Sequence, residues 1–293
     1  MLTAVFGLTG ALIFGAADFL GGLASRRISA VRVTALSAAT GLVVLLIATV
    51  FVGGTWSSGA ILWGTLSGVS GALAISLLYA SLAIGPMSIL SPLTAVLGAV
   101  VPMTWGLLSG DRFAPIGYAA LALALVAVVL VGFVPEKGAV RPSVRGLLFA
   151  SGSGIMIGAF MIFIHQAPND SGLIPLVMNR AANSSIMFAT IGILVWVRGG
   201  RTAGLSNGIE HTGARWLPGL PLALACGVVD AVGNTLLLIG LRVGDLSVMS
   251  VLTAMYPAGT IILAAIVLKE RIAPVQWAGL VLAIAAAGML AIA

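Results

Sequence analysis

Three ionisable side chains lie deep within long apolar stretches of the sequence: Asp18, Arg180 and Asp230. Inserting a charge at the centre of a membrane helix costs about 2.5–3.5 kcal/mol, so each of these residues is a candidate for function. With a rise of about 1.5 Å per residue, counting from the centres of their stretches places Arg180 and Asp230 at a similar depth. We therefore predict an Arg180–Asp230 ion pair that faces a central cavity and orients a substrate.

By the same count, Asp18 falls on the other side of the midplane, where no cationic partner is expected. A carboxylate in partly dry surroundings can take up and release a proton near neutral pH, which is what proton coupling requires. We therefore assign Asp18 to proton coupling. A structural role is the competing interpretation, because the segment GAADFLGG is rich in glycine and close to a helix end.

Three amide side chains accompany the predicted ion pair. Asn179 and Asn183 flank Arg180 at the spacing of one helix face, and Asn234 follows Asp230 by one turn. Amides can bind a substrate without adding charge, and they can equally join one helix to another. We include all three in the predicted substrate site and keep the structural alternative open.

Aromatic and proline residues extend the predicted site. Tyr256 and Trp105 are candidates to stack on a planar or cationic ligand. Pro257 follows Tyr256 near the centre of one apolar stretch, and Pro92 and Pro102 lie in the corresponding stretch of the repeat described below. Proline breaks at matching depth in two halves are typical of gating helices beside a binding site. We therefore assign the three prolines to gating.

The composition excludes a water-soluble fold. Hydrophobic residues make up 60% of the 293 residues, charged residues make up 8%, and the mean hydropathy is +1.19. A soluble domain is typically about 45–50% apolar and about a quarter charged. The single cysteine cannot form an internal disulfide, and the basic residues behind the net charge of +6 form no continuous stripe for nucleic acid.

The apolar stretches predict an all-α integral membrane protein of the inner (cytoplasmic) membrane. Each stretch is apolar all round for about 20 residues, without the alternation that a membrane strand needs. The ten expected helices are 4–24, 33–53, 59–83, 86–108, 115–134, 145–165, 172–197, 216–241, 245–268 and 274–292.

The loops between these stretches differ in basic residues. Only Arg112 and Arg242 follow even-numbered stretches. The positive-inside rule then places the odd-numbered loops in the cytoplasm and both termini outside. The basic residues of the odd-numbered loops are Arg26, Arg27, Arg32, Lys137, Arg141, Arg145, Arg198, Arg201, Arg215, Lys269 and Arg271.

The chain also contains an internal repeat with an offset of 159 residues. The repeat unit has five helices, an odd number, so the halves 1–137 and 138–293 must cross the bilayer in opposite senses. Inverted repeats of this kind surround a midplane cavity and support alternating access. The polar and proline matches are Ser88 with Ser247, Thr94 with Thr253, Arg112 with Arg271 and Pro115 with Pro274.

Two matching tails, SGDRFAPIGYAALALALVAVVLVG and LKERIAPVQWAGLVLAIAAAGML, are similar to the repeated Gly-Glu-Arg tail of the drug/metabolite transporter superfamily. The resemblance is to its EamA-type branch of ten-helix transporters. The first tail has Asp111 where the family has Glu, and the second has Lys269 where it has Gly. The resemblance implies efflux or uptake of small organic metabolites, often driven by a proton or solute gradient.

We therefore expect a secondary active transporter, with proton-coupled export as the first interpretation. Two acids against one arginine give the cavity a charge of about −1, which favours an amino-acid-like zwitterion or a cation. A metabolite importer and a passive facilitator are the alternatives, and a membrane-embedded enzyme is a weaker one. We expect no cofactor, metal ion or catalytic residue; the expected partners are the substrate, protons and lipid, and a monomer can suffice.

Overall fold

The computed structural model describes residues 2–84, 86–132, 142–199 and 219–292 of the chain. These residues form helices joined by short connections and contain no strand. The predicted boundary between residues 137 and 138 lies outside the described residues, as do Lys137, Arg141, Arg201 and Arg215. The elements are α1 (Leu2–Ser25), α2 (Ala30–Val52), α3 (Ser58–Leu82), α4 (Met87–Ser109), α5 (Pro115–Gly132), α6 (Val144–His165), η1 (Asn169–Ser171), α7 (Ile174–Gly199), α8 (Leu220–Val243), α9 (Leu246–Thr253), α10 (Tyr256–Val267) and α11 (Pro274–Ile292).

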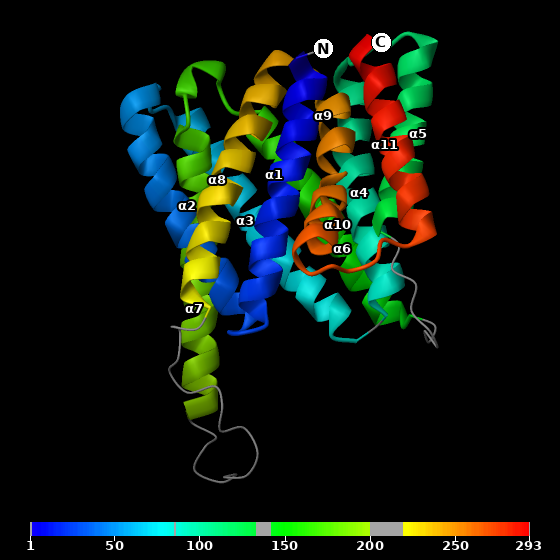
Figure 1. Cartoon of the computed structure of the whole chain (residues 1–293). Coiled ribbons are helices and arrows are strands. Elements are labelled where there is room, and N and C mark those ends of the chain that lie inside the picture. The colour runs from blue at the N-terminus through cyan, green and yellow to red at the C-terminus, as the bar shows by residue number, and fades with distance from the viewer. Residues whose placement is uncertain (1, 85, 133–141, 200–218, 293) are drawn as a thin grey trace.

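Nine spans among the described residues are long and apolar enough to cross a membrane, with α9 and α10 counted as one span. The remaining long helix, α7, carries the polar residues of the predicted site and packs against α2 and α3 within the same bundle. The helices stand side by side in Figure 1. The all-α integral membrane fold predicted from the sequence is therefore confirmed.

The predicted helix 245–268 is interrupted. It forms two helices, α9 and α10, which are separated at Ala254 and Met255. Pro257 explains the break, because its ring would clash with the carbonyl of Thr253, four residues earlier, in a continuous helix. The expected break in the first half is absent: α4 runs continuously from Met87 to Ser109 with two prolines inside it.

The helix contacts repeat when each element is exchanged for its counterpart in the other half. The α3–α6 contact has its counterpart in α1–α8, and the α3–α7 contact in α2–α8. The pairs α2–α7, α4–α9 and α5–α11 each join an element to its own counterpart. Since each half contains five crossings, this pattern is what a two-fold axis in the membrane plane produces.

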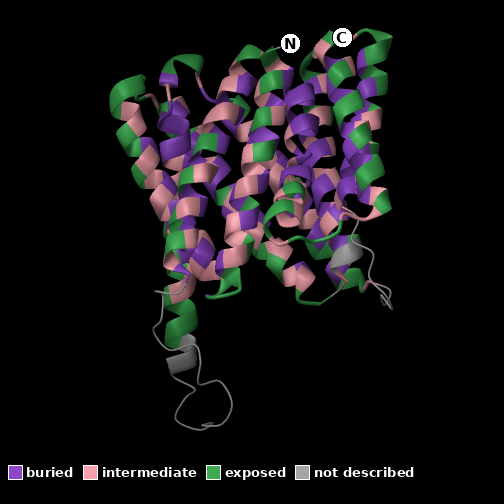
Figure 2. Ribbon diagram, viewed as in Figure 1, coloured by how far each residue is buried: buried purple, intermediate pink, exposed green. Residues whose placement is uncertain are grey.

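The bundle has two ends, and both termini of the chain lie at the same one (Figure 1). We call the end that carries Leu2 and Ile292 the termini face, and the end that carries Arg26, Lys269 and Arg271 the basic face. Figure 2 shows buried residues along the middle of the bundle and exposed residues on its outer sides. Val50 is 81% exposed and Phe51 is 83% exposed on α2, as expected for side chains that face lipid.

Candidate functional site

The predicted ion pair is present in the structure. Nη2 of Arg180 lies 2.5 Å from Oδ2 of Asp230, and the two side chains are 12% and 20% exposed. The pair bridges α7 and α8, and α2 packs against both of these helices. A Cβ atom on Gly41 of α2 would lie 3.5 Å from Cδ of Arg180, so this glycine lies under the arginine stem.

Asn234 supports the acidic member of the pair. Its Nδ2 atom donates to the backbone carbonyl of Asp230 at 2.8 Å and to Oδ1 of the same residue at 3.3 Å. Both carboxylate oxygens of Asp230 therefore have a partner, one in Arg180 and one in Asn234. A charge with few water contacts needs such partners, because an uncompensated one in the interior is strongly destabilising.

The other two amides differ in how they are used. Asn179 donates from Nδ2 to the hydroxyl of Ser67 at 2.8 Å and so joins α7 to α3. Oδ1 of Asn183 and Nε of Arg180 are buried and have no hydrogen-bond partner among the described residues. A buried unpaired group costs about 1–3 kcal/mol, so this acceptor and this donor favour a ligand that offers both kinds of hydrogen bond.

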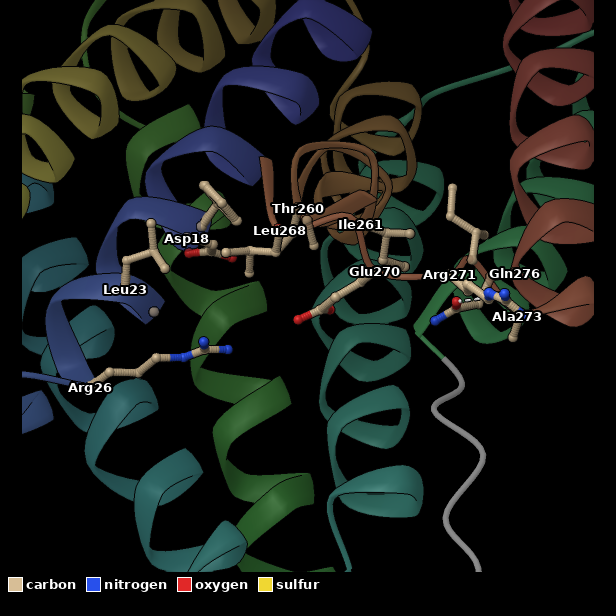
Figure 3. Close-up of a pocket in the computed structure, with 14 residues that line it drawn as sticks. Asp18, Leu23, Arg26, Thr260, Ile261, Leu268, Glu270, Arg271, Ala273 and Gln276 are labelled. Carbon is tan, nitrogen blue, oxygen red and sulfur yellow. Dashed lines mark hydrogen bonds between the residues drawn. The ribbon is translucent and has the colours of Figure 1, made fainter. Parts of the chain in front are cut away.

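Asp18 lines a pocket that is separate from the ion pair. The pocket has a volume of about 510 Å³ and lies between α1, α10, the segment 268–273 and the start of α11 (Figure 3). Asp18 is exposed within it, and Figure 3 shows Arg26 and Glu270 nearer the basic face. Neither Arg180 nor Asp230 lines this pocket.

The Asp18 carboxylate nevertheless interacts electrostatically with the acidic member of the ion pair. Asp18 lies within electrostatic range of Asp230 and of Tyr256. Beside Asp18, the hydroxyl of Thr260 on α10 donates to the carbonyl of Gly15 at 3.1 Å. Because a Cβ atom on Gly15 would collide with the α10 backbone, glycine at this position lets α1 and α10 approach closely.

The predicted aromatic and gating residues lie elsewhere. Trp105 is 46% exposed on α4 and does not line the pocket, and Tyr256 is half-buried at the first position of α10. Pro92 and Pro102 are buried inside α4, and Pro257 lies in the first turn of α10. The pocket therefore combines Asp18 and Thr260 with the segment 268–273, and neither Trp105 nor Tyr256 lines it.

Several pocket residues were missed by the sequence prediction. Arg26 served only as a topology marker, Arg271 as a topology marker and a repeat match, and Glu270, Thr260 and Gln276 had no assigned role. The internal repeat contains a signal for two of them, because Glu270 and Arg271 occupy the places of Asp111 and Arg112. An acidic residue followed by arginine thus ends the fourth span of each half.

Polar contacts between different segments close the termini face. Near the pocket mouth, by contrast, the hydroxyl of Ser25 donates to Gly22 and the amide of Ala273 donates to Gln276, both within one segment. Arg26, Glu270 and Arg271 line the pocket at the basic face, and cross-segment hydrogen bonds hold the opposite end. Those contacts join Thr55 to Asp170 (2.7 Å), Arg242 to Gly172 (2.8 Å), the Ser247 amide to Asp111 (3.0 Å) and the Ser247 hydroxyl to Met103 (2.9 Å).

Comparisons with known proteins agree with this architecture. The profile of the EamA-like transporter family matches residues 144–292. A protein solved by crystallography is similar over 99% of this chain and 97% of its own, with a TM-score of 0.71; its 17% identity supports the fold alone. No curated protein matches the sequence. The chain belongs to the EamA-like transporter family.

Proposed function

We propose that the chain is a secondary active transporter that exports a small polar organic metabolite across the inner membrane by alternating access, coupled to protons. The observation that carries the proposal is the pocket around Asp18, which opens on the basic face while the termini face is held closed. Such an arrangement is one of the two states that alternating access requires. The positive-inside rule assigns the basic face to the cytoplasm.

The substrate site in this proposal centres on the Arg180–Asp230 pair. Arg180 offers an unpaired Nε donor, and Asn183 offers an unpaired carbonyl oxygen. A zwitterion, with a carboxylate that accepts and an ammonium group that donates, matches both. Asn234 and Asn179 hold the pair and α7 in place through their own hydrogen bonds.

Asp18 couples the substrate to the proton in this proposal. With Asp18 ionised, the charged region of Asp18, Arg180 and Asp230 has a net charge of −1 and attracts an ammonium group; with Asp18 protonated it is neutral. Exchange of a proton for the substrate on this region gives antiport. Movement of 1–137 against 138–293, eased by the break before Pro257, would carry the site from one face to the other.

Transport by purified protein in proteoliposomes tests the proposal. A substrate is first identified by thermal stabilisation against a metabolite library, because binding to the folded state must raise its apparent stability. We expect an imposed pH gradient to drive that substrate uphill, against the proton flow. Strictly downhill flux would identify a passive facilitator, and uphill movement with the proton flow would identify an importer.

A further inference from the structure

An acidic residue follows the fourth span in each half of the chain. Asp111 and Glu270 are equivalent under the offset of 159 residues. Each follows a residue with positive φ, Gly110 at 124° and Lys269 at 56°, and Lys269 is the one non-glycine among the described residues with this conformation. Because L-residues avoid positive φ, its presence at Lys269 indicates that each copy needs a sharp turn before the acid. The two turns differ in detail, because the amide of Asp111 donates to the carbonyl five residues earlier and the amide of Glu270 to the carbonyl six residues earlier.

The acid of the first copy joins the two halves at the termini face. The backbone amide of Ser247, in the first turn of α9, donates to Oδ2 of Asp111 at 3.0 Å. Amides in the first turn of a helix have no partner within the helix, and a negative charge there is favourable. The hydroxyl of Ser247 adds a hydrogen bond to the carbonyl of Met103 on α4 at 2.9 Å, so α4 and α9 are held together at this end.

The acid of the second copy lies in an open environment. Glu270 is exposed and lines the pocket beside the basic face (Figure 3). The α10 helix packs against α1 and α5, and it makes at most slight contact with α4 in the part of the chain that the structure describes. The symmetry that relates the two halves would pair Glu270 with the amide of Ser88, in the first turn of α4.

The shorter acid has a glycine beside it, and the longer acid has an alanine at the equivalent position. A Cβ atom on Gly106 would collide with the Asp111 carboxylate and with Ser247, so the short acid needs glycine beside it. The counterpart of Gly106 is Ala265, which carries a Cβ atom. Glutamate at 270 is longer than aspartate by one methylene, enough to reach around that methyl group.

We propose that Asp111 and Glu270 are alternating latch residues: Asp111 caps α9 while the pocket is open to the basic face, and Glu270 caps α4 through the Ser88 amide when that face closes. The inference rests on the proposed alternating access. It assigns each acid a positioning role in one state of the cycle, without contact to the substrate. Loss of either latch therefore shifts the population of states in one direction, and the two losses act in opposite directions.

The test measures how readily a reporter cysteine in the pocket reacts. Ala264 lines the pocket, and Ala264→Cys in a Cys226→Ala background provides a single thiol. The full chain in nanodiscs is labelled with a membrane-impermeant maleimide. Ser247→Pro removes the amide that donates to Asp111. We expect this variant and Asp111→Asn to slow labelling about threefold or more. We expect Ser88→Pro and Glu270→Gln to leave the labelling rate unchanged or to raise it.

Matched variants separate latch loss from misfolding. Proline is tolerated in the first turn of a helix, so Ser247→Pro removes one donor without breaking α9. Ser247→Ala keeps the amide and should label faster than Ser247→Pro. Equal labelling of these two variants, or slowing by the variants of both latches, would overturn the proposal.

The same samples distinguish failure of the latch from failure of the proposed function. Uphill transport by the unmodified chain without the opposite labelling responses would overturn the latch and leave the transporter. Opposite labelling responses without proton-driven transport would support the latch and overturn the coupling.

Discussion

Nη2 of Arg180 on α7 and Oδ2 of Asp230 on α8 lie 2.5 Å apart, and α2 packs against both of these helices. The long arginine stem passes over Gly41, where the absence of a side chain leaves room for it. A fixed charge pair of this kind can support both the fold and a ligand. The two contributions are separable by experiment.

Removing one member of the pair should destabilise the protein strongly. Asp230→Asn or Arg180→Ala leaves a buried charge without compensation, and we expect a loss of about 3–5 kcal/mol in the free energy of unfolding. The double change Arg180→Met with Asp230→Leu should recover most of that loss, because an apolar pair has no charge to desolvate. Thermal unfolding in detergent measures all of these variants. Recovered stability with full substrate binding in the double variant would contradict a binding role for the pair.

Asp18→Asn should separate coupling from binding. The amide has nearly the same shape as the protonated acid but cannot release a proton, so we expect uphill transport in a pH gradient to stop. Substrate binding, measured as thermal stabilisation, should remain detectable. Unchanged gradient-driven transport by the Asp18 variant would rule out the coupling role.

The sequence predicted the depth of residues better than their direction. The rise per residue of a helix is constant, so counting along 172–197 and 216–241 was enough to bring Arg180 and Asp230 to the same level. The rotation of each helix about its own axis cannot be counted along the sequence in this way. Spans that are apolar all round carry little information about which side faces a pocket. For this reason the sequence did not predict that the pocket combines Asp18 with the segment 268–273 and leaves out Trp105.

The break between α9 and α10 shows a second limit of the sequence. Prolines in both halves predicted two interrupted helices, yet α4 remains continuous around Pro92 and Pro102. A proline removes one hydrogen bond, and neighbouring helices decide whether the chain bends or compensates. Thr94 illustrates compensation, because its hydroxyl donates both to Leu90 within α4 and to Ala150 on α6. In α9 the hydroxyl of its counterpart Thr253 is buried without a hydrogen-bond partner among the described residues.

Gly106→Ala should weaken closure of the termini face. The added methyl group would collide with the Asp111 carboxylate and the Ser247 hydroxyl, so α4 and α9 must move apart at this end. We expect slower labelling of the pocket thiol, as for Asp111→Asn. Gly288→Ala on α11 is the matched control, because nothing lies within 4 Å of the added atom there. Equal labelling of the two variants would contradict tight closure at Gly106.

Asp245, just before α9 at the termini face, should make the stability of the fold depend on pH. Partial burial and the nearby charge of Asp111 raise the pKa of the Asp245 carboxyl above its ordinary value. The folded state therefore binds this proton more tightly than the unfolded chain, and the ionised form destabilises the fold near neutral pH. Asp245→Asn should unfold at a higher temperature than the unmodified chain at pH 7. The difference should shrink as the pH falls through the raised pKa toward about 4, the ordinary value for aspartate. A difference that grows on acidification would contradict this assignment.

Asn179 and Asn183 lie one turn apart on α7 and should respond oppositely to truncation. Asn179→Ala removes the hydrogen bond to Ser67 that joins α7 to α3, so we expect a loss of about 1–3 kcal/mol in stability. Asn183→Ala removes a carbonyl oxygen that has no partner among the described residues, so stability without substrate should change little. The stabilisation that substrate adds should fall for Asn183→Ala and persist for Asn179→Ala. Melting temperatures with and without substrate give both quantities, and the reverse pattern would move the binding role from Asn183 to Asn179.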